Sequence, residues 1–312
     1  MLLSLLAFLR FLLRWQHVAP GTQCEGPEGV ATVVRQLAGL PLPAAAWEHS
    51  VLPARVRGYQ REWLDQLTLQ GEVAWLRLWD SGRGALRQAP LCLLPYADLE
   101  GWLALAVPPD AGDLGHAARA LHAELQRRGA CFPGELRKAT GLLPSALEDG
   151  LAELVGRGLM TCDSFALLRQ LLVAPSRRRF PVAAPGRFSL RRPPDAAAAP
   201  DAEWLARRLL DRWGVVFRAV LARETLPLPW RDLLRALRLL ELRGEVRGGR
   251  FVQGFSGEQY AWPAALPLLR QVRGDSSAPP QHVAAADPLN LRGILTPDER
   301  ISPTTQVSVP VA

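Results

Sequence analysis

The chain has 312 residues, of which 48% are hydrophobic and 21% charged, and this composition excludes a disordered chain and leaves room for two or three folded domains. A formal net charge of +7 favours a polyanionic partner such as DNA or RNA. The only lysine, Lys138, is followed by Ala139, which excludes the loop G-x-x-x-x-G-K-[ST] that holds ATP phosphates, so we expect no ATPase and no bound cofactor in this chain by itself.

Residues 1–50 are predicted to form an N-terminal helical segment. Residues 1–13, MLLSLLAFLRFLL, resemble a signal peptide, but the basic stretch before the apolar run is missing and Arg10 interrupts it. The run is also too short to span a bilayer. We therefore expect a buried amphipathic helix rather than a membrane or export segment, and its abrupt start suggests a chain that begins within a larger architecture.

The four cysteines are far apart and include no C-x-x-C pair. They are Cys24, Cys92, Cys131 and Cys162. This spacing argues against a zinc site and against a disulfide framework. We expect reduced thiols in a cytoplasmic protein, without a metal.

A pattern of leucines followed by glycine recurs three times. Two leucines three residues apart precede Gly71, Gly158 and Gly244, and these glycines are 87 and 86 residues apart. Even spacing of a shared pattern indicates repeated supersecondary units. Such leucines line one helix face, and a left-handed glycine ends the helix before an apolar residue begins a strand. This order is typical of a winged helix, whose recognition helix leads into the wing.

The sequence between 51 and 180 is predicted to form two units. Residues 51–115 form a β-rich, barrel-like element or a partial winged-helix unit, with a helix over 59–70 and strands over 72–79 and 84–94. Residues 116–180 form a winged-helix unit with helices over 116–128, 133–140 and 145–157, and Ser145 is its expected N-cap. Residues 181–200, rich in Pro, Ala and Arg, are predicted to be a linker.

The clearest winged-helix unit is predicted over 201–265. A long helix is expected over 202–223, a short one over 230–234 and the recognition helix over 235–243. Gly248-Gly249, between two short apolar segments, predicts the tight turn of the wing. Residues 266–312 are predicted to be an extended C-terminal tail. The fold class is therefore mainly α with small β elements (α+β), built from tandem winged-helix units.

A run of arginines extends from the unit predicted over 116–180, through the predicted linker, into the unit predicted over 201–265. Residues 165–223 contain 12 arginines and only four acids. A groove that follows phosphates explains the run, because binding releases condensed counterions; a solvated basic linker is the alternative. The arginines that we assign to such a groove are Arg177, Arg178, Arg179, Arg207 and Arg208.

The predicted recognition helix carries its own basic stripe. Arg231, Arg235 and Arg238 share one helix face, and leucines occupy roughly the opposite face. This is what a helix lying in a DNA groove requires, although a salt-bridged exposed helix gives the same pattern. Arg247 and Arg250 flank the predicted wing turn, where a contact with a backbone phosphate is expected.

Several motifs together resemble the C-terminal region of the bacterial Lhr family, the large helicase-related proteins. The resemblance covers about residues 11–300. The motifs are LPARV at 52–56, GLMTCDSF at 158–165, RFSL at 187–190, RWGVVF at 212–217, GEVRGGRFV at 244–252, GFSGEQY at 254–260 and AADPLN at 285–290.

The family consists of ATP-dependent DEAD/DEAH-box helicases with two motor domains that precede winged-helix and β-barrel modules. The resemblance therefore implies DNA or RNA as the partner and a role in DNA repair or unwinding. The motor motifs that would bind ATP and Mg²⁺ are missing here. We expect either a split or truncated gene or a motor supplied by another polypeptide.

The resemblance also implies a second function, because a uracil-excising activity is associated with the family's C-terminal region. Such chemistry needs a carboxylate or amide that positions water against the flipped nucleotide. Asp287 is our candidate for that carboxylate; an aspartate that stabilises a turn is the alternative. A third hypothesis is an adaptor that binds protein partners through its winged helices.

Overall fold

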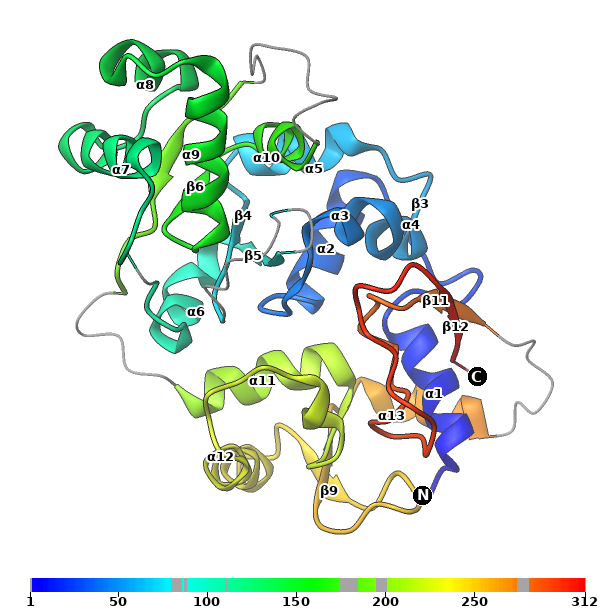
Figure 1. Cartoon of the computed structure of the whole chain (residues 1–312). Coiled ribbons are helices and arrows are strands. Elements are labelled where there is room, and N and C mark those ends of the chain that lie inside the picture. The colour runs from blue at the N-terminus through cyan, green and yellow to red at the C-terminus, as the bar shows by residue number, and fades with distance from the viewer. Residues whose placement is uncertain are drawn as a thin grey trace. The chain divides into compact units, whose positions relative to one another are not determined.

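A computed structural model describes residues 2–79, 86, 89–109, 111–173, 185–194, 201–273 and 281–311. The chain forms two compact units, each assembled from segments that are distant in sequence (Figure 1). Unit 1 contains residues 1–37, 49–59 and 199–312, and unit 2 contains residues 38–48 and 60–198. The α+β fold class is confirmed, since helices predominate and the sheets have only two or three strands.

Unit 1 is built around helices from both ends of the chain. Helix α1 packs against α13, and α2 packs against α4 and α11. The helices and strands of this unit are α1 (Leu5–Trp15), β1 (Cys24–Glu25), α2 (Gly26–Gln36), α4 (Leu52–Arg55), β3 (Val56–Arg57), α11 (Ala202–Trp213), β8 (Val215–Val216), η5 (Val220–Arg223), α12 (Trp230–Leu242), β9 (Arg247–Gly249), β10 (Gln259–Ala261), α13 (Ala265–Arg273), β11 (His282–Ala284) and β12 (Ser308–Pro310).

Unit 2 contains the middle of the chain. Its strands are short, and its longest helices, α7 and α9, pack against each other. Its elements are β2 (Leu42–Pro43), α3 (Ala44–Ala46), α5 (Arg61–Leu69), β4 (Val73–Leu76), β5 (Pro90–Pro95), η3 (Tyr96–Asp98), α6 (Leu99–Leu105), α7 (His116–Arg128), α8 (Pro133–Thr140), α9 (Pro144–Gly156), β6 (Met160–Cys162), α10 (Phe165–Leu172) and β7 (Phe188–Leu190). The π-helical turn η1 (Trp47–Val51) contains the change from unit 2 to unit 1.

The winged helix of unit 1 has the order α11, β8, η5, α12, β9, β10. Its three strands form one antiparallel sheet in which β10 lies between β8 and β9. The prediction of a short helix over 230–234 and a separate recognition helix is wrong, because α12 runs unbroken from Trp230 to Leu242. Leu233, Leu237 and Leu240 are buried along it, so one continuous apolar face supports a single helix. The short second helix is η5, earlier in the chain.

The first helix of this winged helix ends ten residues earlier than predicted. It ends at Trp213 rather than Arg223, because Gly214 adopts φ +65° and turns the chain into β8. A Cβ atom at this glycine would lie 2.5 Å from the ring of Phe11, so both the backbone angle and the close approach of α1 require glycine.

The second winged helix consists of α7, α8, α9 and the antiparallel pair β6–β7. The bounds of α7 and α8 agree with the prediction. Helix α9 begins at Pro144 with Leu143 as its N-cap, so the prediction of Ser145 as the cap is wrong; proline suits the first helical position because it needs no N–H partner. Strand β7 lies inside the predicted linker, and its pairing with β6 makes it the second strand of the wing.

The β-rich element of unit 2 is a three-stranded sheet. Strand β5 pairs with β2 on one side and with β4 on the other, in the register Val73↔Pro95 to Leu76↔Cys92. Both main strands are shorter than predicted, and part of the predicted second strand lies outside the described residues. In the described part of the chain no sheet closes into a barrel.

The three repeated glycines have the same backbone geometry. Gly71, Gly158 and Gly244 adopt φ of +74°, +71° and +77°. In each copy the N–H after the glycine donates to the carbonyl five residues earlier, at 3.0, 3.0 and 2.9 Å. This is the hydrogen bond of a Schellman motif. The sequence repeat is therefore a repeated helix end, and the left-handed glycine predicted from it is confirmed.

The ends of the chain are both folded into unit 1. Helix α1 is amphipathic and its apolar face is buried, as predicted. In the part of the chain that the structure describes, no helix has the length and hydropathy needed to span a bilayer. The C-terminal segment is not wholly extended, because α13 precedes the antiparallel pair β11–β12. All four cysteines are free.

A substitution at one repeated glycine tests this helix end. Gly71→Ala is expected to lower the free energy of unfolding by about 1–2 kcal/mol, because alanine is strained in the left-handed region. No atom lies within 4 Å of the added methyl group, so packing does not contribute. Gly156→Ala is the matched control: its site in α9 is equally open, and alanine there is expected to raise stability by about 0.5–1 kcal/mol. Urea denaturation in which both variants change stability in the same direction would contradict the geometry.

Candidate nucleic-acid interface

The exposed face of α12 carries the basic stripe that the sequence predicts. The side chains of Arg231, Arg235 and Arg238 are 79%, 75% and 54% exposed. Helix α12 packs against α11 (Figure 1), and the leucines of its opposite face are buried. The helix is therefore held in the unit by its buried leucines, and its opposite face exposes three guanidinium groups to solvent.

Two of these arginines have only weak carboxylate contacts. Asp232 lies 3.6 Å from Nε of Arg231 and 3.3 Å from Nη1 of Arg235. Exposed pairs at such distances are worth little, so a phosphate can replace the contact at small cost. Arg231 and Arg235 are the members of the stripe that remain available to a ligand.

Arg238 has a different role, because it ties α12 to the segment that follows the wing strand. Its guanidinium forms a two-bond ion pair with Glu258, whose carboxylate also accepts a hydrogen bond from Tyr260. The hydrogen bonds from Arg238 and Tyr260 lower the pKa of Glu258 to about 2, so this carboxylate is ionised at neutral pH. A second hydrogen bond also connects α12 with the wing: the N–H of Gly248 donates to the Glu241 carboxylate on α12 at 3.0 Å.

The wing turn is not where the sequence predicts it. Gly248 and Gly249 lie within β9, paired with β10 in the register Gly249↔Gln259, so the connection between the strands is the loop 250–258. The prediction of a tight Gly-Gly turn is wrong. Arg247 is in the strand and Arg250 begins the loop; both are exposed, and no ion pair to either is found among the described residues.

The loop 250–258 is fixed to the body of unit 1. The buried amide of Gln259 accepts hydrogen bonds from the N–H groups of Phe251 and Val252 and donates to the carbonyl of Val252. Leu3 pairs with Val252 as a parallel bridge, and the ring of Phe255 lies 4.9 Å from that of Phe217. The wing is therefore held in place before any ligand binds.

The arginines of α11 are largely committed to carboxylates. Arg207 forms an ion pair with Glu245 at 2.8 Å, and Arg208 lies 3.3 Å from Asp211. Both side chains are less than a third exposed, at 29% and 22%. Their predicted contact with phosphates stays a prediction, and their observed contacts brace the helix and the turn after α12.

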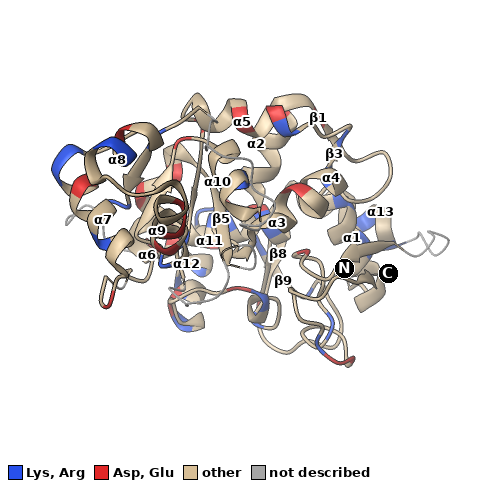
Figure 2. Ribbon diagram, turned by 45° about the horizontal axis from the view of Figure 1, so that its top comes forward, with Lys and Arg blue, Asp and Glu red and all other residues tan. Residues whose placement is uncertain are grey.

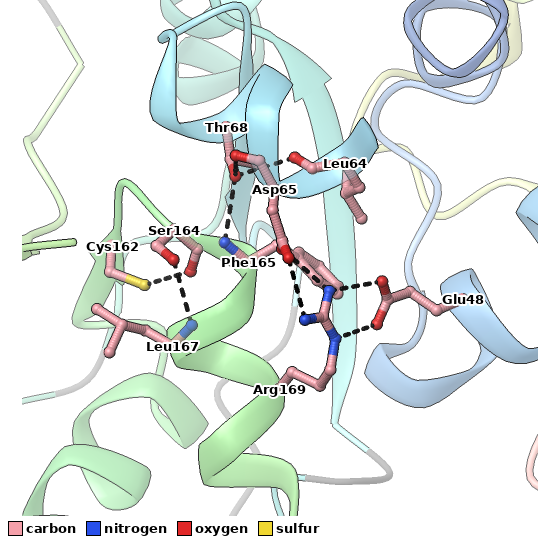
Figure 3. A network of polar contacts seen from close by, with 9 residues as sticks. All are labelled: Glu48, Leu64, Asp65, Thr68, Cys162, Ser164, Phe165, Leu167 and Arg169. Atoms are coloured by element: carbon pink, nitrogen blue, oxygen red, sulfur yellow. Dashed lines mark hydrogen bonds and ion pairs between the residues drawn. The ribbon is translucent and has the colours of Figure 1, made fainter. Parts of the chain in front are cut away.

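The arginine run is divided between the two units, with residues 165–198 in unit 2 and residues 199–223 in unit 1. Arg169, at its start, contacts two carboxylates in unit 2: Glu48 at 2.7 and 2.8 Å and Asp65 at 3.0 and 3.1 Å (Figure 3). Arg177, Arg178 and Arg179 lie outside the described residues.

The helix of unit 2 that corresponds to α12 is acidic. Helix α9 contains Glu148, Asp149 and Glu153 and no basic residue, and Figure 2 shows red segments along it and blue segments on α8. Glu148 is buried and Glu153 forms an ion pair with Arg157 at 2.9 Å, so Asp149 is the exposed carboxylate of α9, and the helix has no guanidinium for a phosphate. The two winged helices are therefore alike in fold and unlike in their surface charge.

Asp287, the candidate catalytic carboxylate, lies in the core of unit 1. It is 1% exposed and forms a two-bond ion pair with Arg55, with N–O distances of 2.6 and 2.8 Å. Arg55 is fully buried and also donates to Gln16 of the segment after α1, at 3.1 Å. The N–H of Leu289 donates to the same carboxylate. The catalytic role of Asp287 stays a prediction; its observed contacts are structural.

Sequence reasoning missed the partners that define these sites. Arg55 is 232 residues from Asp287, and Glu258 is 20 residues from Arg238. The available signal was an arginine inside the apolar stretch VLPARV, since a charge in such a stretch needs a buried counter-charge.

Comparison with known proteins gives two family matches. Both describe a winged-helix domain of the large helicase-related protein, the third such domain over residues 4–96 and the fourth over residues 195–281.

Two curated relatives match almost the whole chain. The "Lhr helicase/ probable uracil glycosylase" of Mycolicibacterium smegmatis is 32% identical over 332 residues, covering 92% of this chain and 21% of that protein. The "Lhr helicase/uracil glycosylase" of Escherichia coli K12 is 30% identical over 345 residues, covering 93% of this chain and 22% of that protein. The chain thus spans about a fifth of the length of these relatives. Among solved structures, the Streptomyces sahachiroi DNA glycosylase AlkZ has a TM-score of 0.49 and 15% identity, over 93% of this chain and 77% of that one.

The buried ion pair generates a stability prediction. Asp287→Ala is expected to lower the free energy of unfolding by about 3–5 kcal/mol, because it leaves the Arg55 guanidinium buried without a counter-charge. Arg57→Ala is the control, since its ion pair with Glu25 is 63% and 68% exposed and is worth at most about 1 kcal/mol. If urea denaturation gives equal losses for the two variants, the structural role of Asp287 is wrong.

Proposed function

Because the chain belongs to the large helicase-related family, we propose that it binds the backbone of DNA or RNA through the winged helix of α11, α12 and the wing. In this proposal it acts as the nucleic-acid-binding C-terminal module of an Lhr-type helicase. The observation that carries the proposal is the exposed face of α12, where Arg231 and Arg235 are 79% and 75% exposed and only weakly paired.

The proposal is supported by a low free-energy cost of forming the interface. Guanidinium groups suit phosphate oxygens, and their exposure here means that a phosphate can reach them without breaking a strong internal contact. The ion pair of Arg238 with Glu258 and the hydrogen bonds of Gln259 fix the wing beside the helix. Arg247 and Arg250 then extend the basic surface from the helix into the wing. A pre-ordered surface loses little conformational entropy on binding.

The wider role that we propose follows the family. It is DNA repair or unwinding in the cytoplasm, with ATP and Mg²⁺ used by a helicase motor that acts together with this module. The relatives carry the word helicase in their names, which supports this part of the proposal. An adaptor that binds proteins through its winged helices is the alternative.

Removing the basic stripe is expected to weaken nucleic-acid binding. The triple variant of Arg231, Arg235 and Arg238 to alanine should lose at least about tenfold in affinity, or about 1.4 kcal/mol. A plot of log K against log salt has a negative slope, to which each phosphate contact contributes about −0.9. The double variant Arg231→Ala/Arg235→Ala should therefore reduce the magnitude of this slope by up to about 1.8. Fluorescence anisotropy with a labelled duplex at several salt concentrations measures both quantities.

A matched control separates local contacts from total charge. Arg127→Ala/Arg128→Ala removes two exposed arginines from α7 of unit 2, whose partner is Glu124. This variant should keep its affinity and salt slope. An equal loss in the control would contradict the α12 interface, and a wild-type affinity that does not change with salt would favour the adaptor.

We infer a second candidate function, excision of uracil from DNA, from the glycosylase names of the two curated relatives. Asp287 is the proposed residue. Its carboxylate is held by Arg55 and buried, so direct action on water would require it to leave that pair.

Alkali treatment of uracil-containing single strands after incubation with the chain tests excision. Asp287→Asn removes the counter-charge of Arg55 but keeps an oxygen that accepts one of its hydrogen bonds, so it should cost less stability than Asp287→Ala. If Asp287 is the catalyst, this variant shows no cleavage under conditions in which circular dichroism reports a folded chain. Unchanged cleavage by the folded variant would exclude Asp287, and no cleavage by the wild type would exclude excision by this chain alone.

A further inference from the structure

Unit 2 contains a cavity of about 270 Å³ that the proposed function does not use. Its lining comes from α5, β4, η3, α6, β6 and the segment around β7. Leucine and valine side chains form much of it, including Val73, Leu76, Leu99, Leu103 and Leu190. The volume lies just below the range of about 300–1,000 Å³ typical of small-molecule pockets, so it limits the ligand to the size of one nucleotide or less.

The charged residues of the lining are mostly basic. They are Arg187, Arg191, Arg192 and one carboxylate, Asp163. Asp163 is bound to Arg187 at 3.1 Å, and Arg192 lies 3.3 Å from Glu100 in an exposed pair. The lining therefore keeps an excess of positive charge beside an apolar wall.

Arg191 is the least compensated of these residues. It is half-buried, and Nη1 of its guanidinium donates to the carbonyl of Arg77 at 3.1 Å. Burial lowers its pKa, and among the described residues no carboxylate forms an ion pair with it. A half-buried guanidinium without a counter-charge attracts a phosphate more strongly than an exposed one, because less water screens the interaction.

The lining also offers an aromatic ring. Tyr96 lines the cavity and is 51% exposed, so the ring is accessible to a ligand. Bases stack on such rings with little preference for sequence. Ser189 also lines the cavity, and its hydroxyl can bond the polar edge of a base or a sugar, whereas the Thr161 hydroxyl donates to the carbonyl of Trp75 at 2.6 Å and can only accept a further bond.

We propose that this cavity binds a single unstacked nucleotide, with its phosphate against Arg191 and its base against Tyr96 and the apolar wall. The nucleotide is either a free nucleoside monophosphate or one residue of a single strand. The proposal is independent of α12, because every residue of the lining belongs to unit 2.

Calorimetric titration of the full chain tests the proposal with four probes: thymidine 5′-monophosphate, thymidine, inorganic phosphate and pentathymidylate. Thymidine and phosphate alone should each bind at least about tenfold more weakly than the monophosphate, since each makes half of the contacts. Arg191→Ala should weaken nucleotide binding by at least about tenfold.

Ala130→Trp provides a second variant that does not depend on Arg191. Ala130 is an exposed residue of the lining, so an indole there fills the entrance without disturbing the core. It should abolish nucleotide binding, and it decides the test if Arg191→Ala does not fold. Arg137→Ala, an exposed arginine of α8 outside the cavity, is the control and should bind normally.

The two sources of the nucleotide give different results. If the wild type binds the monophosphate and Ala130→Trp does not, the ligand of the cavity is a free nucleotide. If only pentathymidylate binds, and this binding is lost in Ala130→Trp but kept in Arg231→Ala/Arg235→Ala, the ligand is a nucleotide within a strand. The proposal is overturned if neither probe shows binding that Ala130→Trp removes, or if inorganic phosphate binds as tightly as the monophosphate.

Discussion

In unit 1, a guanidinium and a carboxylate lie out of water, and each is stable there only because the other is present. Isolated charges are costly to bury, and the Arg55–Asp287 pair offsets that cost with two short hydrogen bonds. The pair joins α4 to the C-terminal segment, and Gln16 extends it to α1 and, through a bond to the carbonyl of Arg212, to α11. Four segments are thus held around one charge pair, and the last of these contacts is made at the C-terminal end of α11, the first helix of the winged helix.

The arginines of this chain have different roles, depending on whether the fold pairs them with a carboxylate. Arg55, Arg212 and Arg169 are bound to carboxylates inside the units. Arg238 and Arg207 brace the wing and the turn after α12, whereas Arg231, Arg235, Arg247 and Arg250 remain exposed with weak partners or none in the described residues. A net charge of +7 alone does not distinguish these groups. Binding capacity depends on which guanidiniums the fold leaves unsatisfied.

The sequence predicted features that depend on neighbours in the chain. The glycine-stopped helices, α7, α8 and the exposed face of α12 follow from spacing of leucine, glycine and arginine over a few residues. Features set by distant contacts were missed. Phe11 approaches Gly214 so closely that a side chain there would clash, the wing turn lies beyond Gly248-Gly249 because β9 pairs with β10, and Asp287 is buried because Arg55 meets it. The recognition helix of unit 2 is acidic, although its repeat pattern matches that of α12.

Hydrogen exchange with and without a DNA duplex tests the central claim most directly, because it reports contact along the whole backbone in the unmodified chain. DNA that lies on the basic face should slow exchange in α12 and across residues 243–258, and leave α9 and β6 unchanged. The slowing should disappear at high salt, since phosphate contacts are screened there. Slower exchange in α9 with none in α12 would contradict the account, because it would place the strand on the acidic helix.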